Sequence, residues 1–262
     1  MRFEVTSLQA SLSMIFQVWK RNAIQFKRSW LISFFWIVIE PTFILGAMGF
    51  GLGSFITTVD GVAYAEFFFP SLLCISSMFV TYFVSTYDNF AKLTLENTFS
   101  TQILSPIEPK EIAIGEILWA ATKGTLSAVG VSIVALGLGL INTWRIIPAF
   151  FIIYLSCIIF AAFGLIVTTY IRNFDQIIYP SSGLIIPMSL FSDTYFPISS
   201  LPIVFRYFVT IFPLTNAVNS IRHIIIYGFD DYFLIIRIGY LLLLAVFLVR
   251  FAIKRLNKKL LT

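Results

Sequence analysis

Long apolar runs dominate the chain and leave little room for a water-soluble fold. Five of them hold about 20 residues or more with few charges, enough to cross a hydrocarbon core of about 30 Å as helix. They are Trp30 to Ile56, Phe67 to Tyr87, Ile112 to Ile141, Ile146 to Ile171 and Phe233 to Phe251. The composition agrees, with 58% hydrophobic residues, 12% charged residues and a mean hydropathy of +0.91. These features predict an all-α, polytopic membrane protein, because a helix satisfies its own backbone in lipid.

A sixth, shorter run and the segment after it form the most irregular part of the chain. The run Ile177 to Phe191 contains two prolines and covers roughly 22 Å as helix, short of a full crossing. Short pieces bounded by Pro197, Pro202 and Pro213 follow and lead to Arg222. We expect six transmembrane helices, with a re-entrant element at 193–222 between the fifth and sixth that lines a path. The alternative is a surface loop with amphipathic turns.

The segment before the first run has the pattern of a helix that lies on the membrane. Between Ser7 and Arg28, apolar residues recur every three or four positions, and basic and amide residues occupy the other face. We expect residues 1–29 to form an interfacial helix in the headgroup layer. A soluble helix packed on a partner is the alternative.

The distribution of basic residues predicts the orientation. With the N-terminus inside, 13 of the 18 Lys and Arg residues fall on the inner side, including those of the basic tail 254–262. The positive-inside rule therefore places both termini in the cytoplasm. It also explains the net charge of +5 without any nucleic-acid partner.

The sequence contains no pattern typical of an enzyme. Lys123-Gly124-Thr125 has the wrong order for a phosphate-binding loop, and a single histidine allows no Ser-His-Asp arrangement. Two cysteines and one histidine make no metal site. We expect no catalytic residue, no metal and no cofactor on this chain.

Two charges within apolar runs are candidate functional residues. Glu40, just before Pro41, lies in the first run, and Lys123 lies in the third. An ionisable group at such depth is costly unless it is paired or faces water. The functional hypothesis is that Glu40 and Lys123 pair and set helix packing or gating. The alternative is that each finds a separate polar partner.

The polar segment 88–111 is too long for a simple turn. Apolar and polar residues alternate along it and predict a short amphipathic helix that ends near Pro106. Its functional reading is a docking element for a cytoplasmic subunit, and its alternative is a surface helix with no partner. The candidate docking residues are Lys92, Leu93, Glu96, Phe99, Leu104 and Pro106.

Three stretches give the chain a recognisable family pattern. They are Ile39-Glu40-Pro41 with Gly46 to Gly53 downstream, Gly115 to Lys123, and Phe196-Pro197 through Leu201-Pro202 and Pro213-Leu214 to Arg222. Over about residues 20–255 the arrangement resembles the type-2 ABC exporter permeases, especially the subgroup of nodulation lipo-oligosaccharide export permeases. Asn216 departs from the family, which usually has His, Arg, Ser or Tyr there.

The resemblance implies a permease domain at 30–253 that works as half of a transporter in a bacterial inner membrane. It implies separate cytoplasmic ATPase subunits that use ATP and dock on segment 88–111, and a second permease copy. The implied activity is export of an amphipathic lipid-linked saccharide. The alternatives are a drug efflux permease and an ion-coupled secondary transporter that uses Glu40 and Lys123.

Overall fold

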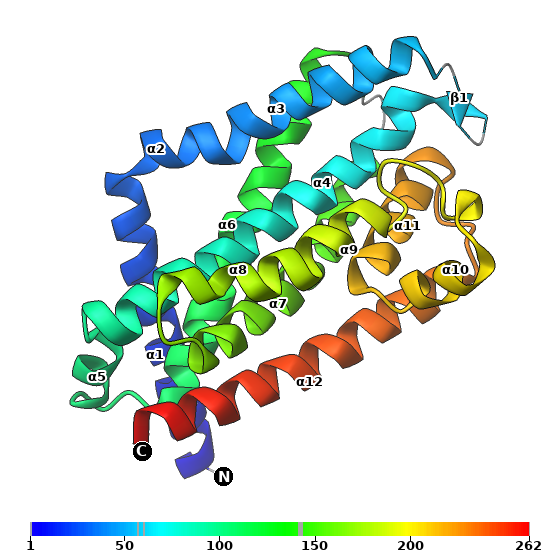
Figure 1. Ribbon diagram of the computed structural model, residues 1–262. Coiled ribbons are helices and arrows are strands. Elements are labelled where there is room, and N and C mark those ends of the chain that lie inside the picture. The colour runs from blue at the N-terminus through cyan, green and yellow to red at the C-terminus, as the bar shows by residue number, and fades with distance from the viewer. Residues whose placement is uncertain (1, 57, 60, 141–143, 262) are drawn as a thin grey trace.

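The computed structural model is a bundle of long helices with two distinct ends (Figure 1). It describes residues 2–56, 58–59, 61–140 and 144–261. Both termini and the short helix α5 lie at one end, which we call the terminal end. The strands β1 (Thr58–Val59) and β2 (Val62–Ala63) pair antiparallel at the other end, which we call the hairpin end.

Five helical segments of the described chain are long and apolar enough to cross a membrane. They are Trp30–Ser54, Tyr64–Leu95, Pro109–Gly137, Ile146–Tyr170 and Phe233–Leu261. The all-α membrane fold is therefore confirmed. In the labels of Figure 1 these segments contain α2 (Trp30–Phe34) and α3 (Glu40–Ile44), then α4 (Tyr64–Phe83), α6 (Pro109–Gly137), α7 (Ile146–Tyr170) and α12 (Phe233–Leu261).

The first span accommodates a proline by changing its helix type. Pro41 has no backbone N–H and would clash with the preceding turn of a regular α-helix. A π-helical turn, Phe35–Ile39, precedes it, and the Glu40 amide reaches the Phe35 carbonyl. A second π turn, Leu45–Gly51, and a 3-10 turn, Leu52–Ser54, complete the span.

The second span is longer than the sequence predicts. It does not end at Tyr87 but continues through the π turns Val84–Asp88 and Ala91–Leu95. Asn97 then adopts a left-handed conformation, with φ of 52°, and α5 (Thr98–Ile103) starts in a new direction. The predicted segment 88–111 is thus the end of a span, a sharp turn and a short helix. The capping box of Glu108 and Glu111 then starts α6.

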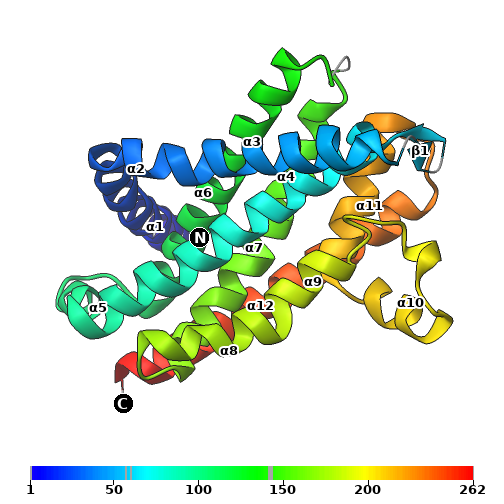
Figure 2. The same ribbon diagram turned by 45° about the horizontal axis from the view of Figure 1, so that its top comes forward.

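The sixth predicted run forms a helix that falls short of the length of a span. A 3-10 turn, Phe174–Ile177, leads into α8 (Ile178–Pro180), a π turn, Ser181–Ile185, and α9 (Ile186–Phe191). This helix lies roughly parallel to α4 and α12 in both views (Figures 1 and 2). Ser181 donates a hydrogen bond of 3.3 Å to the Tyr82 hydroxyl of α4. The count of six spans remains a prediction.

The predicted re-entrant segment contains two helices with different surroundings. A 3-10 turn, Ile198–Ser200, precedes α10 (Ile203–Thr210), whose apolar side chains are mostly exposed. The next helix, α11 (Pro213–Ile226), packs against α4, α7 and α12. The chain therefore leaves the bundle at α10 and returns into it at α11.

Small residues set the distances between the central spans. Gly124 of α6 faces α4 so closely that an added Cβ would lie 1.8 Å from the Thr81 Oγ1 and 2.8 Å from the Ser77 carbonyl oxygen. Ser85, in the π turn that follows α4, donates a hydrogen bond of 2.6 Å to the Ala161 carbonyl of α7. Close approach through small and hydroxyl residues is how helices associate in lipid, where apolar burial adds little.

The Gly124 contact can be tested by adding one methyl group. Gly124→Ala should lower the melting temperature of the purified protein, because overpacking here costs about 1–3 kcal/mol. Gly137→Ala in the same helix is the matched control, since an added Cβ there meets nothing within 4 Å. Equal melting temperatures for the two variants would show that α4 and α6 are not this close.

Candidate functional site

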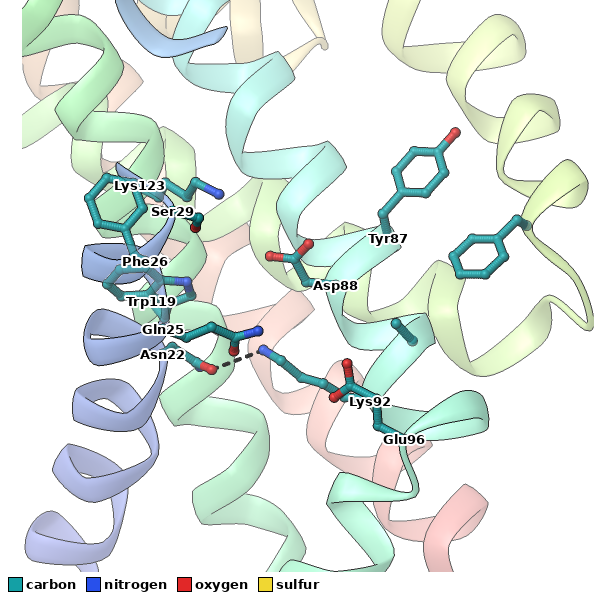
Figure 3. A pocket seen from close by; sticks show the side chains of 12 residues that line it. Asn22, Gln25, Phe26, Ser29, Tyr87, Asp88, Lys92, Glu96, Trp119 and Lys123 are labelled. Atoms are coloured by element: carbon teal, nitrogen blue, oxygen red, sulfur yellow. Dashed lines mark hydrogen bonds between the residues drawn. The ribbon is translucent and has the colours of Figure 1, made fainter. Parts of the chain in front are cut away.

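The carboxylate of Glu116 is the centre of a buried polar cluster at the terminal end. Its Oε1 accepts a hydrogen bond of 2.6 Å from the Arg21 guanidinium. Its Oε2 accepts hydrogen bonds of 2.7 Å from the Lys92 ammonium and 2.9 Å from the Asn22 amide. Lys92 also donates to the Asn22 Oδ1 at 3.0 Å, as Figure 3 shows. One carboxylate therefore joins α1, the end of the second span and α6. We call these four residues the Glu116 cluster.

Local structure brings each member of the cluster into place. Helix α1 (Arg2–Arg28) lies against α6 because Gly115 has no side chain, and an added Cβ would lie 2.6 Å from the Val18 Cβ. About two turns further along α6, the Trp19 indole donates to the Thr122 hydroxyl at 3.2 Å. On the second span, Lys92 lies within the π turn Ala91–Leu95. Such turns are frequent at functional sites.

The buried positions of these groups make their pairing obligatory. The side chain of Glu116 is 1% exposed and that of Lys92 is 7% exposed, whereas Arg21 is 32% exposed. Removing one partner of a buried ion pair leaves an uncompensated charge and is strongly destabilising. The cluster therefore restricts how α1 and the second span can move relative to α6.

The six predicted docking residues do not share one surface. Lys92 belongs to the Glu116 cluster and Phe99 is fully buried, so neither is available to a partner, contrary to the docking interpretation. Leu93 is half-buried. Glu96, Leu104 and Pro106 are exposed, and Leu104 is 89% exposed. Alternation along the segment could not show that its first part continues a span.

Glu40 and Lys123 border the same hollow but are not joined. Among the ion pairs of the described residues, none links the two side chains. The hollow has about 770 Å³ and is mostly apolar. Lys123 lies 5.6 Å from the centre of the Phe26 ring, and Glu40 is exposed on the first span. The hypothesis of a direct pair therefore finds no support in this geometry.

A second polar cluster lies toward the hairpin end. The guanidinium of Arg222, on α11, contacts the Asp193 Oδ2 at 2.6 Å and the Ser71 hydroxyl of α4 at 2.6 Å. It also stacks on the Phe67 ring at 3.8 Å. The other Asp193 carboxylate oxygen accepts from the Ile198 amide at 2.7 Å, just after Pro197. Arg222 thus fastens α11 to α4 and to the turn after α9.

The three predicted prolines mark the ends of these short elements. Pro197 precedes the 3-10 turn, Pro202 precedes α10, and Pro213 is the first residue of α11. Proline is favoured at the first position of a helix, as at Pro213, because its fixed φ suits a helix start and its missing N–H costs nothing there.

Sequence reasoning missed Glu116, Asn22 and Asp193. Glu116 lies within an apolar run, seven positions before Lys123, and this spacing puts both side chains on one face of α6. A carboxylate inside a predicted span was therefore an available signal. Asn22 and Asp193 carried no such signal, because their roles depend on partners from other helices.

Lys92 and Lys110 offer a matched test of the Glu116 cluster. Lys92→Gln breaks a buried ion pair and should cost about 3–5 kcal/mol of folding free energy, seen as a lower melting temperature. Lys110→Gln removes the same charge from a pair with Glu108 whose side chains are 51% and 62% exposed, and should leave the melting temperature unchanged. Identical melting behaviour of the two variants would refute a structural role for the cluster.

Comparison with known proteins gives a consistent result. Residues 14–226 match the family described as ABC-2 type transporter. Nodulation protein J of Rhizobium leguminosarum bv. viciae is 30% identical over 205 residues, which cover 78% of this chain and 79% of the relative. Nodulation protein J of Rhizobium meliloti (strain 1021) is 31% identical over 209 residues, or 80% of each chain.

A more distant relative also aligns over most of both chains. The Inner membrane transport permease YadH of Escherichia coli (strain K12) is 21% identical over 238 residues, which cover 89% of this chain and 90% of the relative. No solved structure matches the chain. The family match spans most of the chain, including the Glu116 and Arg222 clusters, and the chain therefore belongs to the ABC-2 type transporter family of membrane permeases.

Proposed function

We propose that this chain is the membrane subunit of an ATP-driven exporter, with ATP hydrolysed on a separate cytoplasmic chain. The observation that carries the proposal is an exposed apolar surface beside the Glu116 cluster at the terminal end. Leu95 is 66% exposed and Leu104 is 89% exposed, on either side of α5, while Phe99 anchors α5 in the core. The family match supports the same role.

The cluster provides a direct connection from that surface to the spans. Leu95 closes the π turn that holds Lys92, and Lys92 is paired with Glu116 of α6. A force on α5 would therefore reach α6 and α1 through charged contacts that resist separation. In this mechanism the permease itself makes and breaks no covalent bond and holds no cofactor.

The terminal end is the cytoplasmic side in this proposal. The excess of Lys and Arg in the flanks that lie there supports the assignment. In this proposal both termini, α5 and the ATPase contact lie on one side of a bacterial inner membrane. The hairpin end, with α10, then lies on the outer side, and α11 is the returning arm of the re-entrant element.

A second permease copy explains the exposed face of the first span. Glu40 lies about halfway along Trp30–Ser54, and its side chain has no hydrogen bond or ion pair among the described residues. A carboxylate that faced lipid at this depth would cost several kcal/mol. We propose that another copy covers this face, so that the hollow beside Glu40 lies within a dimer.

The proposed cargo is an amphipathic lipid-linked saccharide. Relatives with the printed name Nodulation protein J support the resemblance to lipo-oligosaccharide export permeases. Hydrophobic drug-like molecules are the second candidate cargo.

The ATPase contact can be tested with one exposed leucine. Leu104→Glu should weaken co-purification of the ATPase subunit at least about tenfold, because a charge in a desolvated contact costs more than about 1.4 kcal/mol. The permease should keep its melting temperature, since the side chain contacts solvent in the isolated chain.

Leu261→Glu is the matched control for this test. Leu261 is 67% exposed at the same end of the molecule but belongs to α12. We expect it to leave co-purification unchanged. Full ATPase binding and transport by the Leu104→Glu variant would contradict the proposed docking surface.

A further inference from the structure

A polar hollow lies beside the Glu116 cluster, between α1, the second span and α6. It has a volume of about 310 Å³. Its charged lining consists of Asp88, Lys92, Glu96 and Lys123, two carboxylates and two ammonium groups. Figure 3 shows these side chains around the hollow, with the Asp88 carboxylate and the Lys123 ammonium directed toward each other.

Two of these charges are uncommitted in the structure. Lys92 is bound to Glu116 and Asn22. Among the described residues, Asp88 and Lys123 make no hydrogen bond through their side chains and no ion pair, with each other or with a third group. The Lys123 ammonium lies over the face of the Phe26 ring, 5.6 Å from its centre. The hollow thus presents one negative and one positive group to the same space.

Lys123 also borders the apolar hollow along the first span. That hollow has about 770 Å³ and includes Ile32, Phe35, Ile39 and Phe43 in its lining. The polar hollow and the apolar one therefore meet at a single ammonium group. A molecule with a charged head and a hydrocarbon chain could occupy both at once.

Lys123 lies at the midpoint of α6, 14 positions after Pro109 and 14 positions before Gly137. A charge within such an apolar helix is costly unless a polar group or water meets it, and the Asp88 carboxylate faces it across the hollow.

We propose that the two hollows together bind one phospholipid with a zwitterionic headgroup. Its phosphate accepts from Lys123, its ammonium donates to Asp88, and one acyl chain lies along the first span. With Lys92 already paired with Glu116, the remaining charged lining is Asp88, Glu96 and Lys123, which disfavours a headgroup with negative charge alone. This lipid site is separate from the ATPase contact. The proposal does not depend on which cargo the protein exports.

The experiment is lipid competition on the purified full-length protein, read by native mass spectrometry. The probes are phosphatidylethanolamine, phosphatidylglycerol and a glucosyl diacylglycerol with identical acyl chains, supplied in equal amounts. We expect the protein to retain about tenfold more phosphatidylethanolamine than either of the other two lipids. Each of those lacks at least one charged group of the headgroup and so loses at least one charge-assisted hydrogen bond. This selectivity is measured on the wild type and needs no variant.

Variants then assign the two charges. Asp88→Asn and Lys123→Gln should each lower phosphatidylethanolamine retention about tenfold, whereas Lys20→Gln and Asp230→Asn, at exposed positions outside both hollows, should not change it. Asp88→Asn should also abolish the preference over phosphatidylglycerol. Equal retention of all three lipids by the wild type overturns the proposal, and so does a preference for the glucosyl lipid. Retention that depends on Lys123 but not on Asp88 also overturns it.

Discussion

The buried carboxylate of Glu116 constrains the arrangement of the terminal end more than any other group. This acidic side chain is only 1% exposed, and Arg21, Lys92 and Asn22 supply the positive charge and the donors that its two oxygens contact. These partners come from α1 and from the second span, so the position of both helices relative to α6 follows from one electrostatic requirement. The apolar contacts of α1 alone would not specify it, because Leu12 and Phe16 of that helix remain exposed.

Close helix contacts complete the arrangement in the middle of the bundle. Gly115 admits Val18 of α1, and Gly124 admits Thr81 of α4. Hydroxyl groups such as that of Ser85 then bond across to backbone carbonyls. In lipid, where burial of apolar surface stabilises contacts little, such packing and such hydrogen bonds hold spans together. Toward the hairpin end, the contacts of Arg222 with Asp193 and Ser71 hold α11 in the bundle. This helix is too short to span the membrane alone.

The sequence predicted the features that depend on local composition. Apolar runs showed the membrane class, and the prolines at 197, 202 and 213 marked the starts of short elements. Helix ends within polar stretches were less accessible, because the π turns that extend the second span to Leu95 leave no trace in periodicity. Lys92 looked like a surface residue for the same reason. Its burial depends on Glu116 and Asn22, which lie far away along the chain, and no local pattern reports such a pairing.

The account rests on Lys92 and Glu116 acting as one unit between the second span and α6. A double-mutant cycle tests this most directly, with the free energy of unfolding measured for the wild type, Lys92→Leu, Glu116→Leu and the double variant. Replacing both residues leaves neither of the two buried charges unpaired, and Arg21, the other partner of Glu116, is 32% exposed. The double variant should therefore lose less stability than the two single variants together, with a coupling energy of at least about 1 kcal/mol. Simple additivity of the two losses would contradict the account.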